Sequence, residues 1–442
     1  MQRATSVFTI TDFNTTKKQL LHWANQYSSC SFLDNNQYIS SYNSVECLVG
    51  VGAATVFSPI SHHQQALKTF LDKTPDWLFG HVGYDYKNIL STSLTEQRID
   101  NIGFAPIHFF QPEMVVLLSK NQIEIQSLHT SPDKVFEEIS TTDIEGNAGL
   151  DSQVSVEARI SKDTYLSIIQ QIKQHILRGD CYEINFCQEF FATDANINPL
   201  AVYTQLTQLS PNPFSCYYKL ADKHLLCASP ERYMKKTGNQ LLSQPIKGTF
   251  KRDTNDLNTD NFLKQQLLES SKERAENVMV VDLVRNDLSK ICKESSVNVT
   301  ELFGIYTFPQ VHQMISTIVG EVEDHIDFAD ILEATFPMGS MTGTPKKKVM
   351  ELINQYEVQQ RGLYSGAVGY ITPNKDFDFN VVIRSILYNS TNKYLSYQVG
   401  SGITHYSDAD AEYEECLLKA KSMKRVLEYL LLSFQQKIDA LL

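Results

Sequence analysis

The chain has 442 residues, of which 42% are hydrophobic, and its formal net charge is −12. This length and apolar content are typical of an ordered globular protein with two domains or one large intertwined one, and they exclude a disordered or fibrous chain. The negative charge argues against non-specific binding to nucleic acid or to an anionic membrane, so we expect neither partner. An anionic ligand would need a metal ion or a few cations aimed at it.

The eight cysteines are scattered, and none forms a C-x-x-C pair. This spacing signals neither a zinc site nor a thioredoxin-like motif, and it suits reduced thiols in a cytoplasmic protein. Residues 1–23 hold no apolar stretch of signal-peptide length, and no run approaches the length of about 18 apolar residues that spans a membrane. We therefore expect a cytoplasmic protein.

Short strand-like runs mark the first part of the chain, at 47–52, 114–119 and 123–128, with a helical stretch at 61–73. A helix is predicted at 161–178, because Ser161 can cap its start and Gly179 can end it. Strand-like segments then recur, without a regular alternation of strands and helices and without an internal repeat. This mixture predicts an α+β protein with largely antiparallel sheets.

Residues 131–155 are polar and are the best candidate for a boundary between two regions. We therefore predict an N-terminal region over 1–145 and a catalytic domain over 155–430. The N-terminal region shows few motifs, and the candidate catalytic and ligand-binding residues lie mainly in the second region.

Two residues stand where strand-like runs meet turns. Glu231 lies in SPERY (229–233), and Lys247 lies in SQPIKGTF (243–250). A hairpin between these runs would bring the two side chains to the same end of a sheet. A carboxylate and an amine there could act as an acid and a nucleophile or could form a salt bridge, and the pattern leaves both interpretations open.

Three glutamates on two predicted helices are candidate oxygen ligands. Glu276 projects from the early turns of a helix over 272–291. Glu412 and Glu415 share one face of a second helix, which we expect Ser407 to cap. Mg²⁺ prefers few carboxylates together with water and substrate oxygens, although each glutamate alone is usually solvated.

A glycine-rich segment ends at Thr344 and Pro345, which suit the N-cap and first position of a helix. Lys346 and two further lysines fill the first turn, where the helix dipole favours anions. Free backbone amides and Lys346 indicate an anion-binding site, and a basic helix start in water is the alternative.

Taken together, and in the order in which they follow along the chain, the motifs of the second region resemble those of the chorismate-utilising enzymes, the family that includes anthranilate synthase component I. The matching stretches are GDCYEINFCQEF (179–190), PNPF (211–214), SPERY, PIKGTF, ERAENVMVVDLVRNDL, VHQMIST (311–317), MGSMTGTPK, RGLYSGAVGYI (361–371), VVIRS (381–385) and GSGITHYSDADAEYEE (400–415). The resemblance covers about 160 to 425, whereas the first 130 residues match the divergent N-terminal region of the family poorly.

The resemblance implies large antiparallel sheets packed face to face as a sandwich, with helices outside, as in anthranilate synthase component I. It implies chorismate as the substrate and Mg²⁺ as the cofactor, held by Glu276, Glu412 and Glu415. His312 matches a histidine near C4 of the ring, and Glu231 matches the acid that protonates the departing C4 hydroxyl. The candidate substrate-binding residues, including the lysine of the anion-site interpretation, are Gly248, Thr249, Tyr364, Arg384, Gly400, Ser401, Gly402 and Lys346.

Lys247 distinguishes the branches of this family. The resemblance implies alanine at this position in most anthranilate synthases and lysine, as a covalent nucleophile, in many aminodeoxychorismate synthases. Isochorismate and salicylate synthases use instead a lysine on the strand that matches 182–187, which here reads YEINFC without a lysine. The chain therefore resembles the aminodeoxychorismate synthase branch most closely.

The implied reaction is physically reasonable. Hydroxide is a poor leaving group, so an acid such as Glu231 is required, and burial should raise its pKa. A lysine with a solution pKa of about 10.4 is almost entirely charged at neutral pH, so we expect desolvation and Mg²⁺ to lower the pKa of Lys247. In the reaction that the resemblance implies, Lys247 first attacks C2 of chorismate as the C4 hydroxyl leaves. Ammonia then adds at C4 to give 4-amino-4-deoxychorismate for 4-aminobenzoate and folate synthesis.

The chain contains no G-x-C-x-G nucleophile turn, so we expect ammonia from a separate glutamine amidotransferase subunit. FLDNNQY (32–38) and PNPF loosely resemble the two sides of a tryptophan pocket in this family, which makes Pro213, Phe214 and Ser215 candidate tryptophan contacts. Two alternatives remain, namely anthranilate synthase component I and a catalytically inert regulatory paralogue. Against the paralogue, the acid, the nucleophile, the metal carboxylates and the substrate arginine are all present.

Overall fold

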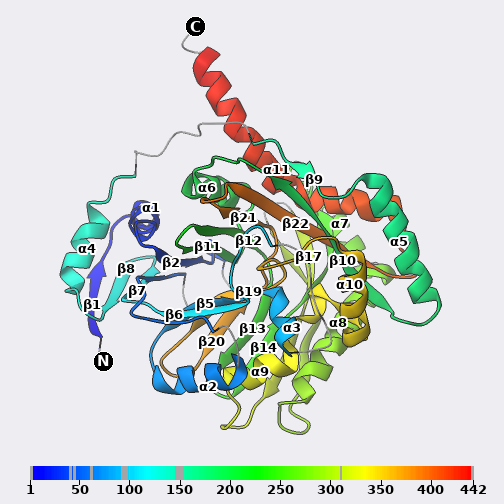
Figure 1. Ribbon diagram of the computed structural model, residues 1–442, viewed down its shortest axis with the longest axis horizontal. Helices are drawn as coiled ribbons and strands as arrows, with labels where there is room; N and C mark the ends of the chain where they lie inside the picture. The colour runs from blue at the N-terminus through cyan, green and yellow to red at the C-terminus, as the bar shows by residue number, and fades with distance from the viewer. Residues whose placement is uncertain are drawn as a thin grey trace.

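The computed structural model describes residues 3–38, 42, 46–59, 63–90, 98, 100–144, 154–308 and 311–439. Two large antiparallel sheets form its centre, and helices lie outside them (Figure 1). This arrangement confirms the predicted α+β sandwich. In the described part of the chain, no helix has both the length and the apolar character needed to cross a bilayer.

Each sheet is antiparallel throughout. Within the described residues, sheet A contains the strands, in order, β1 (Ala4–Thr9), β8 (Gln122–Ser127), β7 (Met114–Ser119), β3 (Cys47–Val51), β2 (Ser29–Asp34), β11 (Phe214–Leu220), β12 (Lys223–Ser229), β21 (Ser385–Asn389), β22 (Tyr394–Ile403), β10 (Glu183–Ala192) and β18 (Gly343–Thr344), with β9 (Glu157–Ala158) also on β10. Sheet B contains, in order, β15 (Ile246–Lys251), β17 (Val311–Glu321), β14 (Gln240–Gln244), β13 (Arg232–Thr237), β20 (Phe377–Asn380), β19 (Ala367–Ile371), β5 (Leu78–Val82), β6 (Ile107–Gln111) and β4 (Thr55–Phe57), with β16 (Asn298–Thr307) also on β17.

The helices surround this sandwich. They are α1 (Phe13–Ala24), α2 (His63–Lys73), α3 (Lys87–Leu90), α4 (Pro132–Ser140), α5 (Lys162–Leu177), α6 (Pro199–Leu209), α7 (Leu257–Glu269), α8 (Ser271–Ser289), α9 (Phe328–Thr335), α10 (Lys346–Tyr356) and α11 (Ala409–Asp439), with 3-10 turns η1 (Tyr84–Tyr86) and η2 (Gly339–Met341). An apolar layer joins sheet A to α1, α4, α5, α6, α10 and α11. Helices α7 and α8 contact β15 and β17 of sheet B.

Strands from both predicted regions share both sheets. In sheet A, β2 pairs with β11, and in sheet B, β5 pairs with β19. The predicted boundary at 145–155 falls largely outside the described residues, and the division of the chain there stays a prediction. The N-terminal strands extend the same two sheets that carry the site described below.

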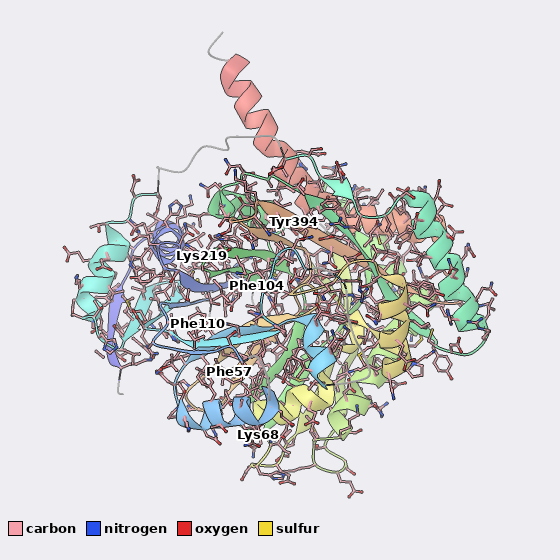
Figure 2. The ribbon with its side chains drawn as sticks, in the orientation of Figure 1. Phe57, Lys68, Phe104, Phe110, Lys219 and Tyr394 are labelled. Atoms are coloured by element: carbon pink, nitrogen blue, oxygen red, sulfur yellow. The ribbon has the colours of Figure 1, made fainter. Side chains whose placement is uncertain are left out.

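A dense aromatic core holds the two sheets together. Gly50 on β3 faces Phe79 on β5, and a Cβ at position 50 would lie 2.6 Å from that ring, so the sheets approach closely only because glycine stands there. Phe57, Phe104 and Phe110, labelled in Figure 2, belong to the same core. Such packing makes the sandwich a rigid support for side chains at its edges.

Helix starts were predicted with mixed success. Ser161 caps α5 and accepts a hydrogen bond from the Thr164 amide, as expected. The prediction that Ser407 caps the last helix was wrong, because α11 begins at Ala409 and Asp408 accepts from the Ala411 amide at 3.0 Å. The Ser407 hydroxyl accepts instead from the amide of Thr404, within the preceding turn.

Candidate active site

Lys247 lies where the edges of the two sheets meet. It belongs to β15, the end strand of sheet B, and its Nζ donates a hydrogen bond to Glu183 on β10 of sheet A. The two side chains are only 11% and 4% exposed. A Cβ at Gly402 on β22 would lie 2.6 Å from Lys247 Nζ and 2.7 Å from Glu183 Oε1, so the pair sits directly against that glycine backbone. The contact joins the two sheets at a buried junction.

In the protein chain without a metal ion, the pKa of Lys247 shifts in the direction opposite to the one expected from the sequence. Burial lowers the pKa of this amine, but the carboxylates of Glu183, Glu276 and Glu415 outweigh burial and raise the pKa above its ordinary value of 10.5. The protein chain alone therefore does not meet the expectation. Lys247 is an ammonium ion that needs a proton acceptor before it can act as a nucleophile.

Glu231 follows the end of β12 and is only 4% exposed. Burial raises the pKa of its carboxyl group to about 7, although the Ser340 hydroxyl, the Lys247 charge and the Ile246 amide all pull the pKa down. Ser340 belongs to the short turn η2. A carboxyl group with a pKa near neutrality can give and recover a proton, which suits the general acid that the sequence predicts.

Two of the three predicted metal ligands face one cation. The Nζ of Lys272 lies 3.8 Å from Glu276 Oε1 and 3.9 Å from Glu412 Oε1. Both carboxylates are buried, and Glu276 Oε1 accepts no hydrogen bond. Glu415 instead pairs with Lys419 at 2.7 Å. Within the described ranges, no three His, Cys, Asp or Glu side chains gather closely enough to hold a metal ion.

The predicted substrate-binding residues Tyr364 and Arg384 share this neighbourhood with Lys419. Arg384 has a φ of 53° and donates from Nη1 to the Lys419 carbonyl at 3.3 Å. Burial lowers the pKa of the Arg384 guanidinium group, and the charges of Tyr364 and Glu415 raise it by less than burial lowers it. Lys419 Nζ donates to the Gly400 carbonyl at 2.9 Å, which places the candidate residues Gly400, Ser401 and Gly402, near the end of strand β22, beside these groups.

The turn that the sequence predicts after Lys247 is instead a continuation of strand β15, at the edge of sheet B. Gly248 has a φ of 94°, a backbone conformation that favours glycine. A Cβ there would lie 3.1 Å from Glu273 Oε2, and Thr249 pairs with Gln313 on β17. Their proposed contacts with substrate stay predictions.

Two other predicted residues direct their polar groups toward protein partners. His312 Nε2 lies 2.9 Å from Asp260 Oδ1. Lys346 Nζ donates to Asp287 and to the Thr335 carbonyl, so its charge is already paired. The contacts with substrate that the sequence predicts for His312 and Lys346 stay predictions.

Three residues of this site were not predicted from the sequence, namely Glu183, Lys272 and Ser340. Glu183 lies within the matched stretch 179–190, but nothing in the sequence shows that β10 meets β15. The available signal was weak, because Glu183 opens a strand that also carries Asn185, Gln188 and Glu189, although a buried carboxylate there needs a partner. Lys272 stands one helical turn before Glu276, a spacing that indicates an ion pair.

A separate cavity lies beside β2, β11 and β20. Its wall contains all three residues predicted for a tryptophan pocket, Pro213, Phe214 and Ser215. Asp34 and Arg232 also line it, and each is already paired within the protein, Asp34 with Lys17 and Arg232 with Asp378.

The sequence profile of the chorismate binding enzymes matches residues 18–425, and the chain belongs to that family. Aminodeoxychorismate synthase component 1 of Bacillus subtilis is 36% identical over 275 residues, which cover 62% of this chain and 57% of that protein. The Escherichia coli protein of the same name is 33% identical over 340 residues, which cover 76% of this chain and 71% of that protein. The probable chloroplastic aminodeoxychorismate synthase of Oryza sativa is 38% identical over 271 residues, 61% of this chain but only 30% of that protein. The chain thus spans less than two thirds of the rice and Bacillus proteins.

Solved structures share the fold. Anthranilate synthase component I from Streptococcus pneumoniae superposes with a TM-score of 0.76 at 24% identity, over 88% of this chain and 95% of that chain. The menaquinone-specific isochorismate synthase MenF of Escherichia coli superposes with a TM-score of 0.75 at 18% identity, over 96% and 95% of the two chains. At these identities the likeness shows the fold alone.

Proposed function

We propose that this member of the chorismate binding enzymes is an aminodeoxychorismate synthase component 1, which aminates chorismate at C4. The observation that carries the proposal is Lys247, a buried amine in contact with Glu183 and close enough to Glu231 to lower its pKa. The bacterial relatives named aminodeoxychorismate synthase component 1 support the same branch. The product would be 4-amino-4-deoxychorismate, on the route to 4-aminobenzoate and folate.

In this proposal Lys247 is the nucleophile and Glu183 is the first proton acceptor, because the two groups are in contact. The free amine forms a bond to C2 of chorismate, both conjugated ring double bonds shift by one position, and the C4 hydroxyl leaves as water with the proton of Glu231. Ammonia then bonds to C4, both double bonds shift back, and the bond between C2 and Lys247 breaks. A proton from the new C4 amine restores Glu231, and Glu183 returns its proton to Lys247.

We propose Mg²⁺ as the cofactor, held by Glu276 and Glu412 with Glu415 beside them. The chain supports this choice, because two buried carboxylates already face one cation and Glu276 Oε1 has no hydrogen-bond donor. The bound ion would supply positive charge for a substrate carboxylate. Arg384 offers a planar fork of donors for the second carboxylate of chorismate, with the Tyr364 hydroxyl beside it.

Two partners complete the proposal. A glutamine amidotransferase subunit would supply ammonia, since the name component 1 of the bacterial relatives implies a second component. Tryptophan would occupy the cavity that Pro213, Phe214 and Ser215 line.

The decisive experiment is mass spectrometry of the purified chain with chorismate, ammonium chloride and MgCl₂. We expect a product in which NH₂ has replaced one OH of chorismate, and a covalent adduct on Lys247. Lys247→Ala should lose both, whereas Lys251→Ala, which removes an exposed lysine on the same strand, should retain them. Anthranilate and pyruvate would show an anthranilate synthase instead, and unchanged chorismate would indicate an inert paralogue.

A further inference from the structure

A buried ion pair that the proposed mechanism does not use joins Glu357 and Arg361, between α10 and β19. Both side chains are 1% exposed. Arg361 donates from Nε to Glu357 Oε2 at 2.9 Å and from Nη2 to Glu357 Oε1 at 2.7 Å. Its guanidinium carbon lies 4.3 Å from the centre of the Tyr84 ring. A charge pair so far from water is tolerated only when its remaining donors and acceptors are bonded as well.

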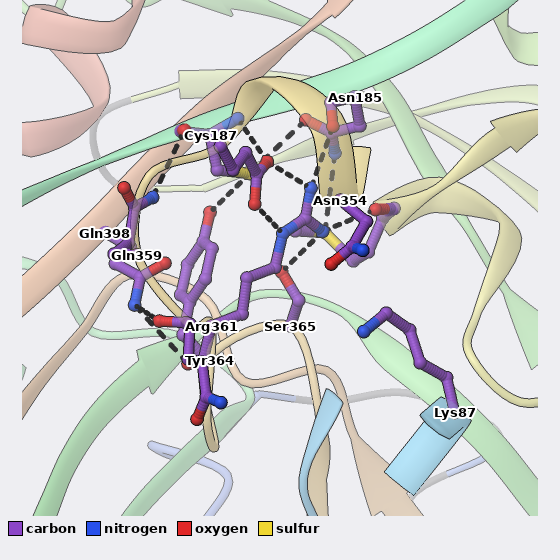
Figure 3. Close-up of polar contacts among 12 residues, drawn as sticks. Lys87, Asn185, Cys187, Asn354, Gln359, Arg361, Tyr364, Ser365 and Gln398 are labelled. Carbon is purple, nitrogen blue, oxygen red and sulfur yellow. Dashed lines mark hydrogen bonds and ion pairs between the residues drawn. The ribbon is translucent and has the colours of Figure 1, made fainter. Parts of the chain in front are cut away.

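Every N–H group of Arg361 has an acceptor. Besides the two bonds to Glu357, Nη1 donates to the Met341 carbonyl at 2.7 Å and to the Ser365 hydroxyl at 3.3 Å. Nη2 donates to the Asn185 carbonyl at 2.8 Å (Figure 3). A guanidinium group has five N–H donors in a fixed plane, so this arrangement uses all of them, and a lysine with three donors cannot reproduce it.

These contacts complete an otherwise open edge of β10. Along this edge, β18 pairs with residues 183–184 of β10, and β9 pairs with residues 190–191 of β10. Between the two, the Asn185 carbonyl accepts from Arg361 and the Cys187 amide donates to Glu357 Oε1 at 2.8 Å. Buried backbone groups at a strand edge need partners, and here the side chains of Arg361, Glu357 and Gln359, which donates to the Cys187 carbonyl, take the place of a strand.

The network reaches the site at two points. Glu183, the partner of the proposed nucleophile, stands two residues before Asn185 on β10. Asn185 Nδ2 donates to the Ser340 carbonyl at 2.9 Å, and the Ser340 hydroxyl bonds the proposed acid, Glu231. Arg361 therefore holds both the strand that carries Glu183 and the turn that carries Ser340.

We propose that Glu357 and Arg361 are positioning residues of the reaction, which keep the strand of Glu183 and the turn of Ser340 in one fixed arrangement. The inference rests on the chorismate activity proposed above. It deepens that proposal, because Glu183, the partner of the nucleophile, and Ser340, the partner of the acid, are both held by this pair. Since rate falls steeply when reacting groups are misplaced, loosening the pair should reduce turnover more than substrate binding.

The test compares Arg361→Lys and Glu357→Gln with a matched pair at the opposite end of sheet A. There Arg3 forms the same two-fold contact with Asp76, at 2.8 and 2.9 Å, and donates to a backbone carbonyl at 2.7 Å. We expect kcat to fall about 100-fold in Arg361→Lys and about 10-fold in Glu357→Gln, with KM for chorismate within about fivefold. Arg3→Lys and Asp76→Asn should keep kcat within about twofold.

A second readout separates positioning from a loss of stability. The groups facing Glu231 are Lys247 from β15, the Ser340 hydroxyl from η2 and the Ile246 amide. If Arg361→Lys displaces Ser340, the pKa of Glu231 rises, so the high-pH limb of kcat/KM moves to higher pH while Arg3→Lys keeps the wild-type profile. The same titration can be followed without turnover by the infrared carboxyl band of Glu231, with Glu231→Gln as the blank.

The outcomes are distinguishable. The inference is overturned if Arg361→Lys keeps the wild-type kcat, or if the titration of Glu231 is unchanged in it. It is also overturned if Arg361→Lys raises KM for chorismate and leaves kcat unchanged. If Arg361→Lys does not fold, Glu357→Gln carries the same two measurements, because its amide keeps the shape of the carboxylate. If the wild-type chain consumes no chorismate, the proposed function fails, and the infrared titration alone decides whether the pair positions Ser340.

Discussion

The buried carboxyl group of Glu231 should make the stability of the fold depend on pH. Its pKa rises from an ordinary 4.5 to about 7 in the folded chain. Between these values the folded chain binds a proton that the unfolded chain has released, so stability is highest at low pH and is lost as pH rises through 7. A pKa difference of one unit corresponds to about 1.4 kcal/mol, so ionisation of Glu231 lowers the free energy of unfolding by about 3 kcal/mol in total.

Urea unfolding of the wild-type chain and of Glu231→Gln at pH 5 and pH 8 measures this contribution. The amide does not titrate, so the pH dependence of all other groups is common to both chains and cancels in the comparison. Going from pH 5 to pH 8, we expect Glu231→Gln to gain about 2 to 3 kcal/mol relative to wild type. An equal difference between the two chains at both pH values would show that Glu231 titrates normally and would refute its assignment as an acid poised near neutrality.

Three further changes test the site. Lys247→Ala should lower C4 amination about 1000-fold or more, because the covalent route is removed, and full turnover in a product assay would exclude that route. Glu276→Gln should raise the Mg²⁺ concentration for half-maximal activity about tenfold or more, and an unchanged Mg²⁺ titration would remove Glu276 from the metal site. Gly402→Ala should lower kcat about 10- to 100-fold, since its Cβ would lie 2.6 Å from Lys247 Nζ; a chain with wild-type kcat and a normal melting temperature would contradict that close approach.

Local patterns in the sequence predicted the elements that depend on neighbours along the chain. The helix over 162–177 and its Ser161 cap follow from residue types within one turn. The helix at 132–140 was missed, because only Pro132, Val135 and Ile139 are buried in an otherwise polar segment. Its stability comes from packing against α1 and β1, which the sequence does not show.

The order of the motifs was enough to indicate the fold class and the family, because these follow from residue identity at many positions together. Tertiary structure alone decided that Lys247 meets Glu183, that Lys346 is already paired with Asp287, and that Arg361 closes the edge of β10. It also decided the charge on the lysine, since a pKa depends on burial and on carboxylates from distant segments. Contacts between strands far apart in the chain, and the dielectric around them, exist only once both sheets have formed.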